Sequence, residues 1–261
     1  MTTFQKLFSK RNPIIACIHL PALPGAPLYA GDMDAIYDAA ITEAKIFSEH
    51  GVDALIVENF RDKPFYPNQV PAETIASLAA VGREIIKAVS IPVGVNVLRN
   101  DAHAAMAIAT AIQAQFIRVN IHMNAVVSEQ GIIQGKSHET LRLREHLKSN
   151  VLIFADVGVK HAAQLAPRGL ATETKDLCER GLADAIIVSG ELTGSATSVS
   201  DLETVKQHST VPVLIGSGVT PGNLKSLHQA DGFIIGSYFK KNGNANNEIE
   251  IARVEKLLSI V

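Results

Sequence analysis

Short apolar segments alternate with longer segments of helical periodicity along nearly the whole chain. The apolar segments are rich in Val, Ile and Ala, and they are continuously hydrophobic instead of alternating with polar residues. This pattern is typical of parallel strands that are buried on both faces of a sheet. We expect eight strands, at residues 14–20, 54–60, 91–98, 116–122, 151–157, 184–190, 211–217 and 230–237.

The segments between these strands predict helices, among them residues 33–50, 73–90, 101–115, 172–180 and 248–261. Eight alternating strand–helix units favour an α/β fold of the closed (β/α)₈ (TIM) barrel type over an open sheet. The 261 residues are close to the ~250 that one such barrel needs. Because no linker or low-complexity tract divides the chain, we expect residues 1–261 to form a single domain.

Composition and charge exclude several classes of partner. The formal net charge is −2 and no basic stripe is present, so we expect no nucleic-acid partner. No segment approaches the ~18 apolar residues of a membrane span, and the N-terminus is short and polar, so we expect no membrane insertion and a cytoplasmic protein. Cys17 and Cys178 lie in apolar patterns and are interpreted as buried reduced thiols. The sequence leaves a homo-oligomer open.

Two glycine–serine turns follow the last two predicted strands. The first contains Gly216, Ser217 and Gly218 and is expected to lead into a helix, and the second contains Gly236 and Ser237. Glycine lets backbone N–H groups approach an anion, and barrel phosphate sites are built by the loops after strands 7 and 8. These residues therefore predict a binding site for a small phosphorylated metabolite.

Carboxylates stand at the ends of two predicted strands, where barrel enzymes carry their catalytic groups. Glu58 follows four apolar residues and is the stronger candidate for acid/base catalysis, because burial favours a carboxyl that exchanges protons near neutral pH. Asp156 is the second catalytic candidate. The alternatives are a structural ion pair for Glu58 and a capping role for Asp156.

Neutral polar residues end other strands and suit recognition of hydroxyl or carbonyl groups: His19, Asn96, Asn120 and Ser189. Side chains two residues apart on a strand share a face, so an inward Asn120 would place Arg118 inside the barrel. A buried arginine needs a carboxylate partner, and we interpret Arg118 as part of a structural ion pair.

No cofactor motif is present. A divalent metal held by the two carboxylates with His19 or His122 stays open, although no ligand spacing is diagnostic. Lys160 is the lysine nearest behind a central strand end, which is weak support for a Schiff-base aldolase. The segment 188–197 is rich in small and hydroxyl residues and is expected to act as a flap over the site, with an ordinary loop as the alternative.

The chain resembles the BtpA/SgcQ family over essentially its whole length. The stretches that carry the resemblance are 18–27 (IHLPALPGAP), 51–60 (GVDALIVENF), 116–120 (FIRVN), 155–157 (ADV) and 216–219 (GSGV). The resemblance implies a ribulose-phosphate-binding barrel. One branch of the family is named for a role in photosystem I accumulation, and another is associated with sugar-phosphotransfer functions.

A looser likeness, confined to motifs, is to the tryptophan synthase α subunit. That likeness implies an acid/base role for Glu58, a closing loop at residues 192–194 and phosphate binding by the last two turns. We therefore expect an isomerase, epimerase or lyase acting on a phosphorylated sugar or related phosphate ester. The alternatives are a non-catalytic assembly or stability factor of BtpA type that binds a metabolite or a partner protein, and a metal-dependent phosphate-hydrolysing enzyme.

Overall fold

Eight parallel strands close into a barrel whose order is β1-β11-β10-β9-β7-β4-β3-β2. The computed structural model describes residues 3–8, 10, 12–158, 162–190 and 197–261. The barrel strands are β1 (Ile14–His19), β2 (Ala54–Glu58), β3 (Val93–Asn96), β4 (Phe116–Val119), β7 (Leu152–Val157), β9 (Ala185–Val188), β10 (Val213–Ile215) and β11 (Gly232–Ile235). The predicted α/β fold, a single-domain (β/α)₈ barrel, is confirmed.

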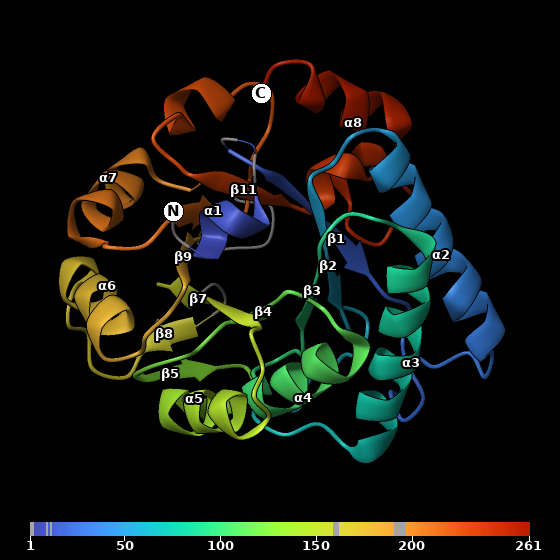
Figure 1. The fold of residues 1–261 in the computed structure, drawn as a ribbon, viewed down its shortest axis with the longest axis horizontal. Helices are drawn as coiled ribbons and strands as arrows, with labels where there is room; N and C mark the ends of the chain where they lie inside the picture. The colour runs from blue at the N-terminus through green and yellow to red at the C-terminus, as the bar shows by residue number, and fades with distance from the viewer. Residues whose placement is uncertain (1–2, 9, 11, 159–161, 191–196) are drawn as a thin grey trace.

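Helices surround the barrel and cover the outer faces of its strands (Figure 1). They are α2 (Met33–Glu49), α3 (Ala72–Ala88), α4 (Ala102–Ile112), α5 (Ser137–His146), α6 (Leu170–Glu179), α7 (Val199–His208) and α8 (Ile251–Leu258). Both faces of each strand are thus buried, which explains the continuous apolar segments in the sequence.

The barrel interior is a packed apolar core below a polar layer. Every second residue of a strand points inward, and large rings such as Phe116 and Phe154 fill the middle, stacked at 4.7 Å between centroids. Gly94 faces the Phe116 ring so closely that an added Cβ would lie 2.2 Å from it. Glycine at this position is therefore a packing requirement.

A short N-terminal helix, α1 (Thr3–Leu7), closes the end of the barrel at which the strands begin. Its Phe4 ring lies 5.8 Å from Phe154, and Phe8, just after the helix, lies 6.5 Å from Phe116. Both side chains belong to the interior core. The sequence pattern did not predict this plug, because five helical residues are too few to show a period.

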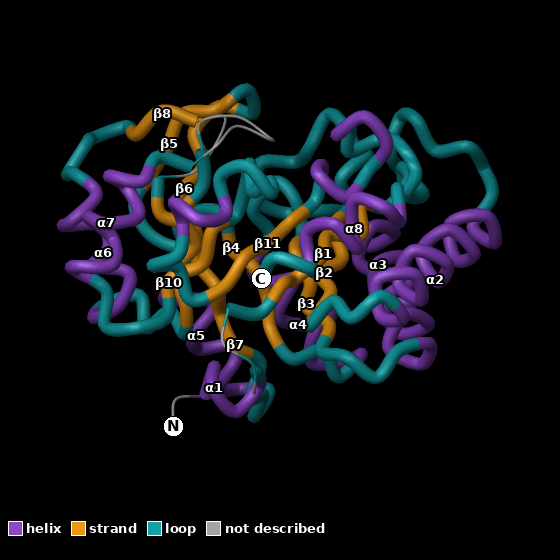
Figure 2. Tube along the Cα trace, turned by 90° about the horizontal axis from the view of Figure 1, so that it is seen from above, coloured by secondary structure: helices purple, strands orange, loops and turns teal. Residues whose placement is uncertain are grey.

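A separate three-stranded antiparallel sheet lies at the opposite end from α1 (Figure 2). It consists of β5 (Ala125–Ser128), β6 (Gly131–Gln134) and β8 (Ala162–Gln164), with β5 in the centre. Ile121, Val126 and Ile133 pack beneath it. The sequence predicted loops here, because strands of three or four residues carry too little alternation to be recognised.

The segment after β10 also differs from expectation. A helix was predicted directly after Gly218, but the chain forms turns followed by the 3₁₀ helix η1 (Leu224–Leu227). Two further 3₁₀ segments, η2 (Ser237–Phe239) and η3 (Lys241–Gly243), follow β11. Among the described residues, no helix has the length and apolar character needed to cross a membrane.

Candidate functional site

The inward residues at the ends of the strands form a continuous polar layer. The strand register pairs His19 of β1 with Glu58 of β2, and Glu58 with Asn96 of β3. Arg118 follows on β4, Asn120 directly after β4 and Asp156 on β7, and all these residues are buried. Because side chains alternate along a strand, residues far apart in the sequence meet in this one layer.

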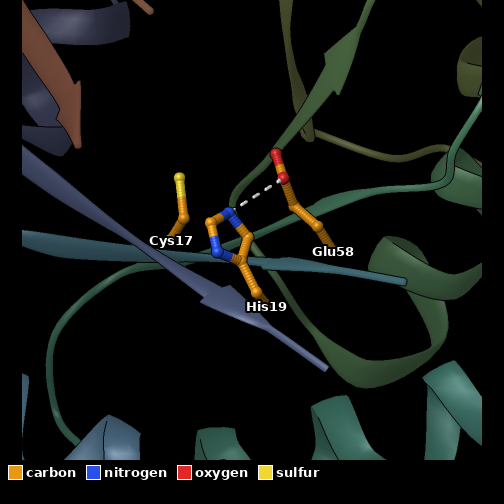
Figure 3. A group of neighbouring side chains, drawn as sticks. All are labelled: Cys17, His19 and Glu58. Atoms are coloured by element: carbon orange, nitrogen blue, oxygen red, sulfur yellow. Dashed lines mark ion pairs between the residues drawn. The ribbon is translucent and has the colours of Figure 1, made fainter. Parts of the chain in front are cut away.

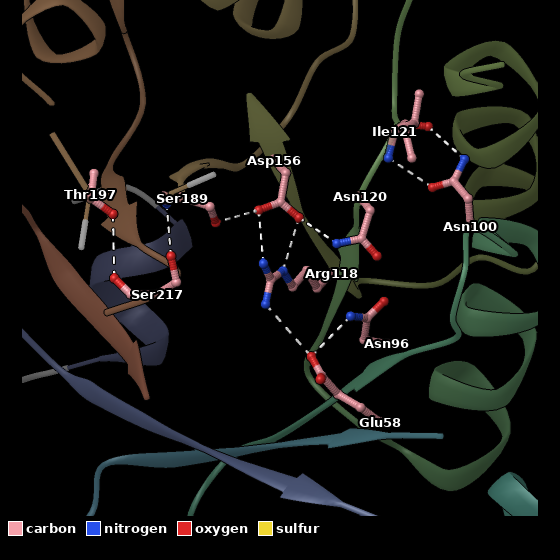
Figure 4. A network of polar contacts seen from close by, with 11 residues as sticks. Glu58, Asn96, Asn100, Arg118, Asn120, Ile121, Asp156, Ser189, Thr197 and Ser217 are labelled. Carbon is pink, nitrogen blue, oxygen red and sulfur yellow. Dashed lines mark hydrogen bonds and ion pairs between the residues drawn. The ribbon is translucent and has the colours of Figure 1, made fainter. Parts of the chain in front are cut away.

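Arg118 lies inside the barrel and holds Asp156 by two hydrogen bonds, from Nε at 3.0 Å and Nη2 at 2.9 Å (Figure 4). Asn120 Nδ2 and Ser189 Oγ also donate to this carboxylate, at 2.6 and 3.3 Å. Burial acts to lower the pKa of the Arg118 guanidinium, but the charges of Asp156 and Glu58 outweigh it and raise that pKa above its usual value. The predicted ion pair of Arg118 is confirmed.

The two oxygens of Glu58 have different surroundings. Oε1 accepts a hydrogen bond from Asn96 Nδ2 at 2.9 Å and lies 3.6 Å from Arg118 Nη1. Oε2 faces His19 Nε2 at 3.7 Å, which is longer than a normal hydrogen bond. Asn96 thus orients the carboxylate, and Oε2 remains available for chemistry.

His19 is an almost fully buried imidazole that stacks on Phe60 with 4.2 Å between ring centroids. Burial lowers the pKa of His19 to about 4, although the neighbouring Glu58 charge opposes this shift. His19 is therefore neutral at pH 7. A Cβ on Gly236 would lie 2.7 Å from the His19 ring, so this glycine makes room for the histidine.

A cavity of about 220 Å³ opens over this polar layer. Most of the residues predicted for the site line it: His19, Glu58, Asn96, Asn120, Gly216, Ser217, Gly218, Gly236 and Ser237. Asp156 and Ser189 line a neighbouring cavity of about 610 Å³ beside β5 and β8, and Asn120 borders both. The structure thus brings the predicted residues together but places the two carboxylates in adjoining cavities.

The glycine–serine turns contribute backbone to the first cavity. Within the described part of the chain, no hydrogen bond uses the backbone N–H groups of Gly218, Val219, Ser237 and Tyr238. All four residues line the cavity. Gly216 also makes room for neighbouring side chains, because a Cβ there would lie 2.7 Å from Ser189 Oγ and 3.2 Å from Arg118 Nη2.

Several cavity residues were not predicted from the sequence. Lys63, Arg99 and Glu129 lie in loops or in the small sheet, and Cys17 lies one layer deeper on β1. Lys63 and Arg99 follow strand ends closely, so their positions in the sequence could have indicated the cavity. No nearby sequence feature indicates that Glu129 lines it. Lys160 and residues 191–196 of the predicted flap lie outside the described residues.

One group of described side chains is close enough to hold a metal ion, and it consists of Cys17, His19 and Glu58. It includes neither Asp156 nor His122, whose Nε2 lies 2.8 Å from the Gly181 carbonyl oxygen. The metal arrangement left open by the sequence, with both carboxylates, therefore differs from the cluster that the fold assembles.

Sequence comparison identifies the family. The model of the BtpA family matches residues 10–261. The chain belongs to the BtpA family. Among the BtpA relatives, an uncharacterised protein of Thermococcus kodakarensis is 46% identical over 252 residues, covering 96% of this chain and 95% of its own. The photosystem I biogenesis protein BtpA of Synechocystis is 42% identical over 260 residues, covering 99% and 90%.

Solved structures support the barrel fold. The N-(5′-phosphoribosyl)anthranilate isomerase of Pyrococcus furiosus superposes on this BtpA-family chain with a TM-score of 0.56, covering 95% of this chain and 97% of its own. Sequence identity is only 15%, so the likeness concerns the fold alone.

Proposed function

We propose that this protein binds a small phosphorylated metabolite, such as a sugar phosphate, and catalyses a proton transfer of the isomerase, epimerase or lyase type. One observation carries the proposal. Among the described residues nothing donates a hydrogen bond to Oε2 of the buried Glu58, which lines the same cavity as Gly218, Val219, Ser237 and Tyr238 with their N–H groups. A cavity that combines a proton acceptor with anion donors suits a phosphate ester.

The charges of the cavity agree with an anionic ligand. Lys63 lines its mouth, and its described interaction is with the face of the Phe60 ring, at 4.9 Å from the centroid. Arg99 lies against the same cavity. In the proposed complex the phosphate binds the N–H groups of the glycine–serine turns and one of these cations, because charge-assisted hydrogen bonds to phosphate are strong.

Glu58 and His19 then act on the carbon end of the substrate. Glu58 Oε2 removes the proton from carbon, and the neutral His19 imidazole donates a hydrogen bond to the adjacent carbonyl or hydroxyl oxygen. Asn96 and Asn120 bind further hydroxyl groups. Asp156 holds Arg118 and Asn120 in place, and in this scheme it is a positioning residue, whereas the sequence had suggested a direct acid/base role.

The test uses proton exchange as its readout. Phosphate esters that raise the melting temperature are incubated with the protein in D₂O, and incorporation of deuterium at carbon is followed by NMR. We expect Glu58→Gln to abolish exchange while binding persists. The exposed Glu248→Gln, a change of the same chemistry, serves as the control. Full exchange in Glu58→Gln, or equal binding of the unphosphorylated analogues, would overturn the proposal.

A second candidate is the non-catalytic assembly factor. The name of the Synechocystis relative favours it, and so does an exposed apolar pair on the small sheet. Val127 and Ile132 are cross-strand partners with 42% and 61% of their surfaces exposed. This function predicts that Val127→Ser with Ile132→Ser abolishes activity in the cell, and that Glu58→Gln does not.

A further inference from the structure

Three side chains that bind transition metals lie together beside the cavity: Cys17, His19 and Glu58 (Figure 3). Cys17 and His19 are two residues apart on β1 and share its inner face, and Glu58 is the register partner of His19 on β2. One ligand atom from each residue lies within 4.8 Å of the others, and all three residues are buried. They present one sulfur, one nitrogen and one oxygen ligand.

The spacing is close to that of a metal site. Bonds of 2.0–2.3 Å in a tetrahedral site separate neighbouring ligand atoms by about 3.3–3.8 Å. His19 Nε2 and Glu58 Oε2, at 3.7 Å, already meet this requirement. Cys17 Sγ lies within 4.8 Å of both atoms and would approach them by about 1 Å on metal binding.

His19 carries one buried polar atom, Nδ1, that the described part of the protein leaves unsatisfied. Nδ1 is buried near the Ala245 backbone without making a hydrogen bond of normal geometry. Nε2 points toward Glu58 at a distance too long for a hydrogen bond. The side chain is more than nine-tenths buried, so the unpaired Nδ1 is an energetic cost, while Nε2, on the Glu58 side of the ring, is the nitrogen placed to bind a metal. A neutral imidazole is the form that coordinates a metal.

Three charged side chains of the polar layer, Glu58, Asp156 and Arg118, carry one net negative charge, although Lys63 and Arg99 bring positive charge to the same cavity. Asp156 holds the Arg118 guanidinium by two hydrogen bonds and balances its charge. Glu58 lies farther from Arg118, at 3.6 Å, and its negative charge is in excess within the group formed by Glu58, Asp156 and Arg118. A divalent ion with a Cys17 thiolate would bring this group, the thiolate and the ion to neutrality.

We propose that Cys17, His19 and Glu58 form a binding site for one divalent ion of the zinc class. The sulfur–nitrogen–oxygen ligand set selects zinc or cobalt over magnesium or calcium, which prefer oxygen ligands alone. Three protein ligands leave a coordination position open, and the cavity lies beside it. This arrangement is typical of catalytic zinc sites, whereas structural sites have four protein ligands.

The metal site would add an ion to the cavity of the proposed function. Any catalytic role of the ion rests on that proposed function. An ion at Glu58 Oε2 would occupy the oxygen that accepts the proton in the metal-free protein. In the metal-bound form Glu58 and His19 would be ligands and the ion would polarise a substrate oxygen, whereas proton transfer by Glu58 Oε2 belongs to the metal-free form. Metal binding itself is independent of any substrate and can be measured alone.

The experiment titrates the chelator-treated full-length protein with Co²⁺ and Zn²⁺. We expect one ion per chain by equilibrium dialysis, with a thiolate-to-cobalt charge-transfer absorption. Cys17→Ser should remove this absorption and weaken binding at least about 100-fold, since even changes to groups around metal ligands cost 10–100-fold. His19→Asn and Glu58→Gln should weaken binding similarly, with circular dichroism showing that each variant is folded.

Cys178→Ser is the matched control, because Cys178 is also buried and outside any disulfide but belongs to α6, away from the cavity. It should leave binding and absorption unchanged. Less than one ion per chain in the wild type, absorption that survives Cys17→Ser, or loss in Cys178→Ser would overturn the metal site. Absence of metal binding together with Glu58-dependent proton exchange would leave the proposed function standing.

Discussion

Replacing Arg118 with methionine should destabilise the protein strongly, because it leaves two buried carboxylates without their cation. Asp156 loses two hydrogen bonds, of 2.9 and 3.0 Å, and keeps those from Asn120 and Ser189. Two unit charges about 4 Å apart attract by about 4 kcal/mol at an effective dielectric constant of about 20. Removing one partner of a buried pair typically costs ~3–5 kcal/mol. We expect a loss of this size in the free energy of unfolding.

A second substitution, at Asp156, tests whether the cost comes from the unpaired carboxylate. Asp156→Asn together with Arg118→Met removes one of the two unpaired charges, so the double variant should recover about 2 kcal/mol relative to Arg118→Met. Lys206→Met is the control. Lys206 lies 2.7 Å from Asp231, but both side chains are partly exposed, and its removal should cost less than ~1 kcal/mol.

Urea unfolding followed by far-ultraviolet circular dichroism measures these changes, since the chain has no tryptophan to report by fluorescence. A loss below about 1 kcal/mol in Arg118→Met would refute the argument. A double variant no more stable than Arg118→Met would refute it as well, because the cost would then not come from the unpaired carboxylate.

Three further predictions concern the plug, the core and pH. Phe4→Ala should lower the free energy of unfolding by about 3 kcal/mol and leave ligand binding unchanged, measured by urea unfolding and calorimetry, since Phe4 packs on Phe154 far from the cavity. Gly94→Ala should cost at least ~1–3 kcal/mol, because its Cβ would clash with the Phe116 ring; an unchanged urea midpoint would contradict this. Burial lowers the pKa of His19 to about 4 from about 6.5 when unfolded, so the unfolded chain binds more protons between these values. As the pH falls from 6.5 to 4, the free energy of unfolding of the wild type should fall by about 3 kcal/mol more than that of His19→Asn. Equal pH profiles of this free energy in the two proteins would contradict the burial of His19.

The barrel fold was predictable because the same sequence pattern, a continuous apolar segment, occurs eight times. Eight apolar segments each indicated the same environment, a strand buried on both faces, so errors in the boundaries of individual strands did not change the predicted fold. The small elements gave no such repetition. The plug α1 and the strands β5, β6 and β8 have three to five residues each, too few for a period to appear.

The sequence predicted which residues line the candidate site better than it predicted how they are arranged there. Strand ends pointed to Glu58, Asn96, Asn120 and His19, since a barrel brings the ends of all its strands to one rim. The pairing of Asp156 with Arg118 required only that both point inward. Which cavity each carboxylate lines was decided by the small sheet, whose strands the sequence did not reveal.

The glycine–serine turns also separate what the sequence predicted from what only the tertiary structure revealed. The sequence by itself placed residues 216–218 and 236–237 at the carboxyl ends of the last two strands, and the structure has them directly after β10 and β11. Only the tertiary structure decided that Gly216 and Gly236 also make room for Arg118 and His19. It likewise brought Cys17 to Glu58. The contact of Gly236 with His19 joins β11 and β1, which are neighbours only because the barrel closes, and the contact of Gly216 with Arg118 crosses the barrel interior. Closure depends on the packing of the whole chain, which no local pattern encodes.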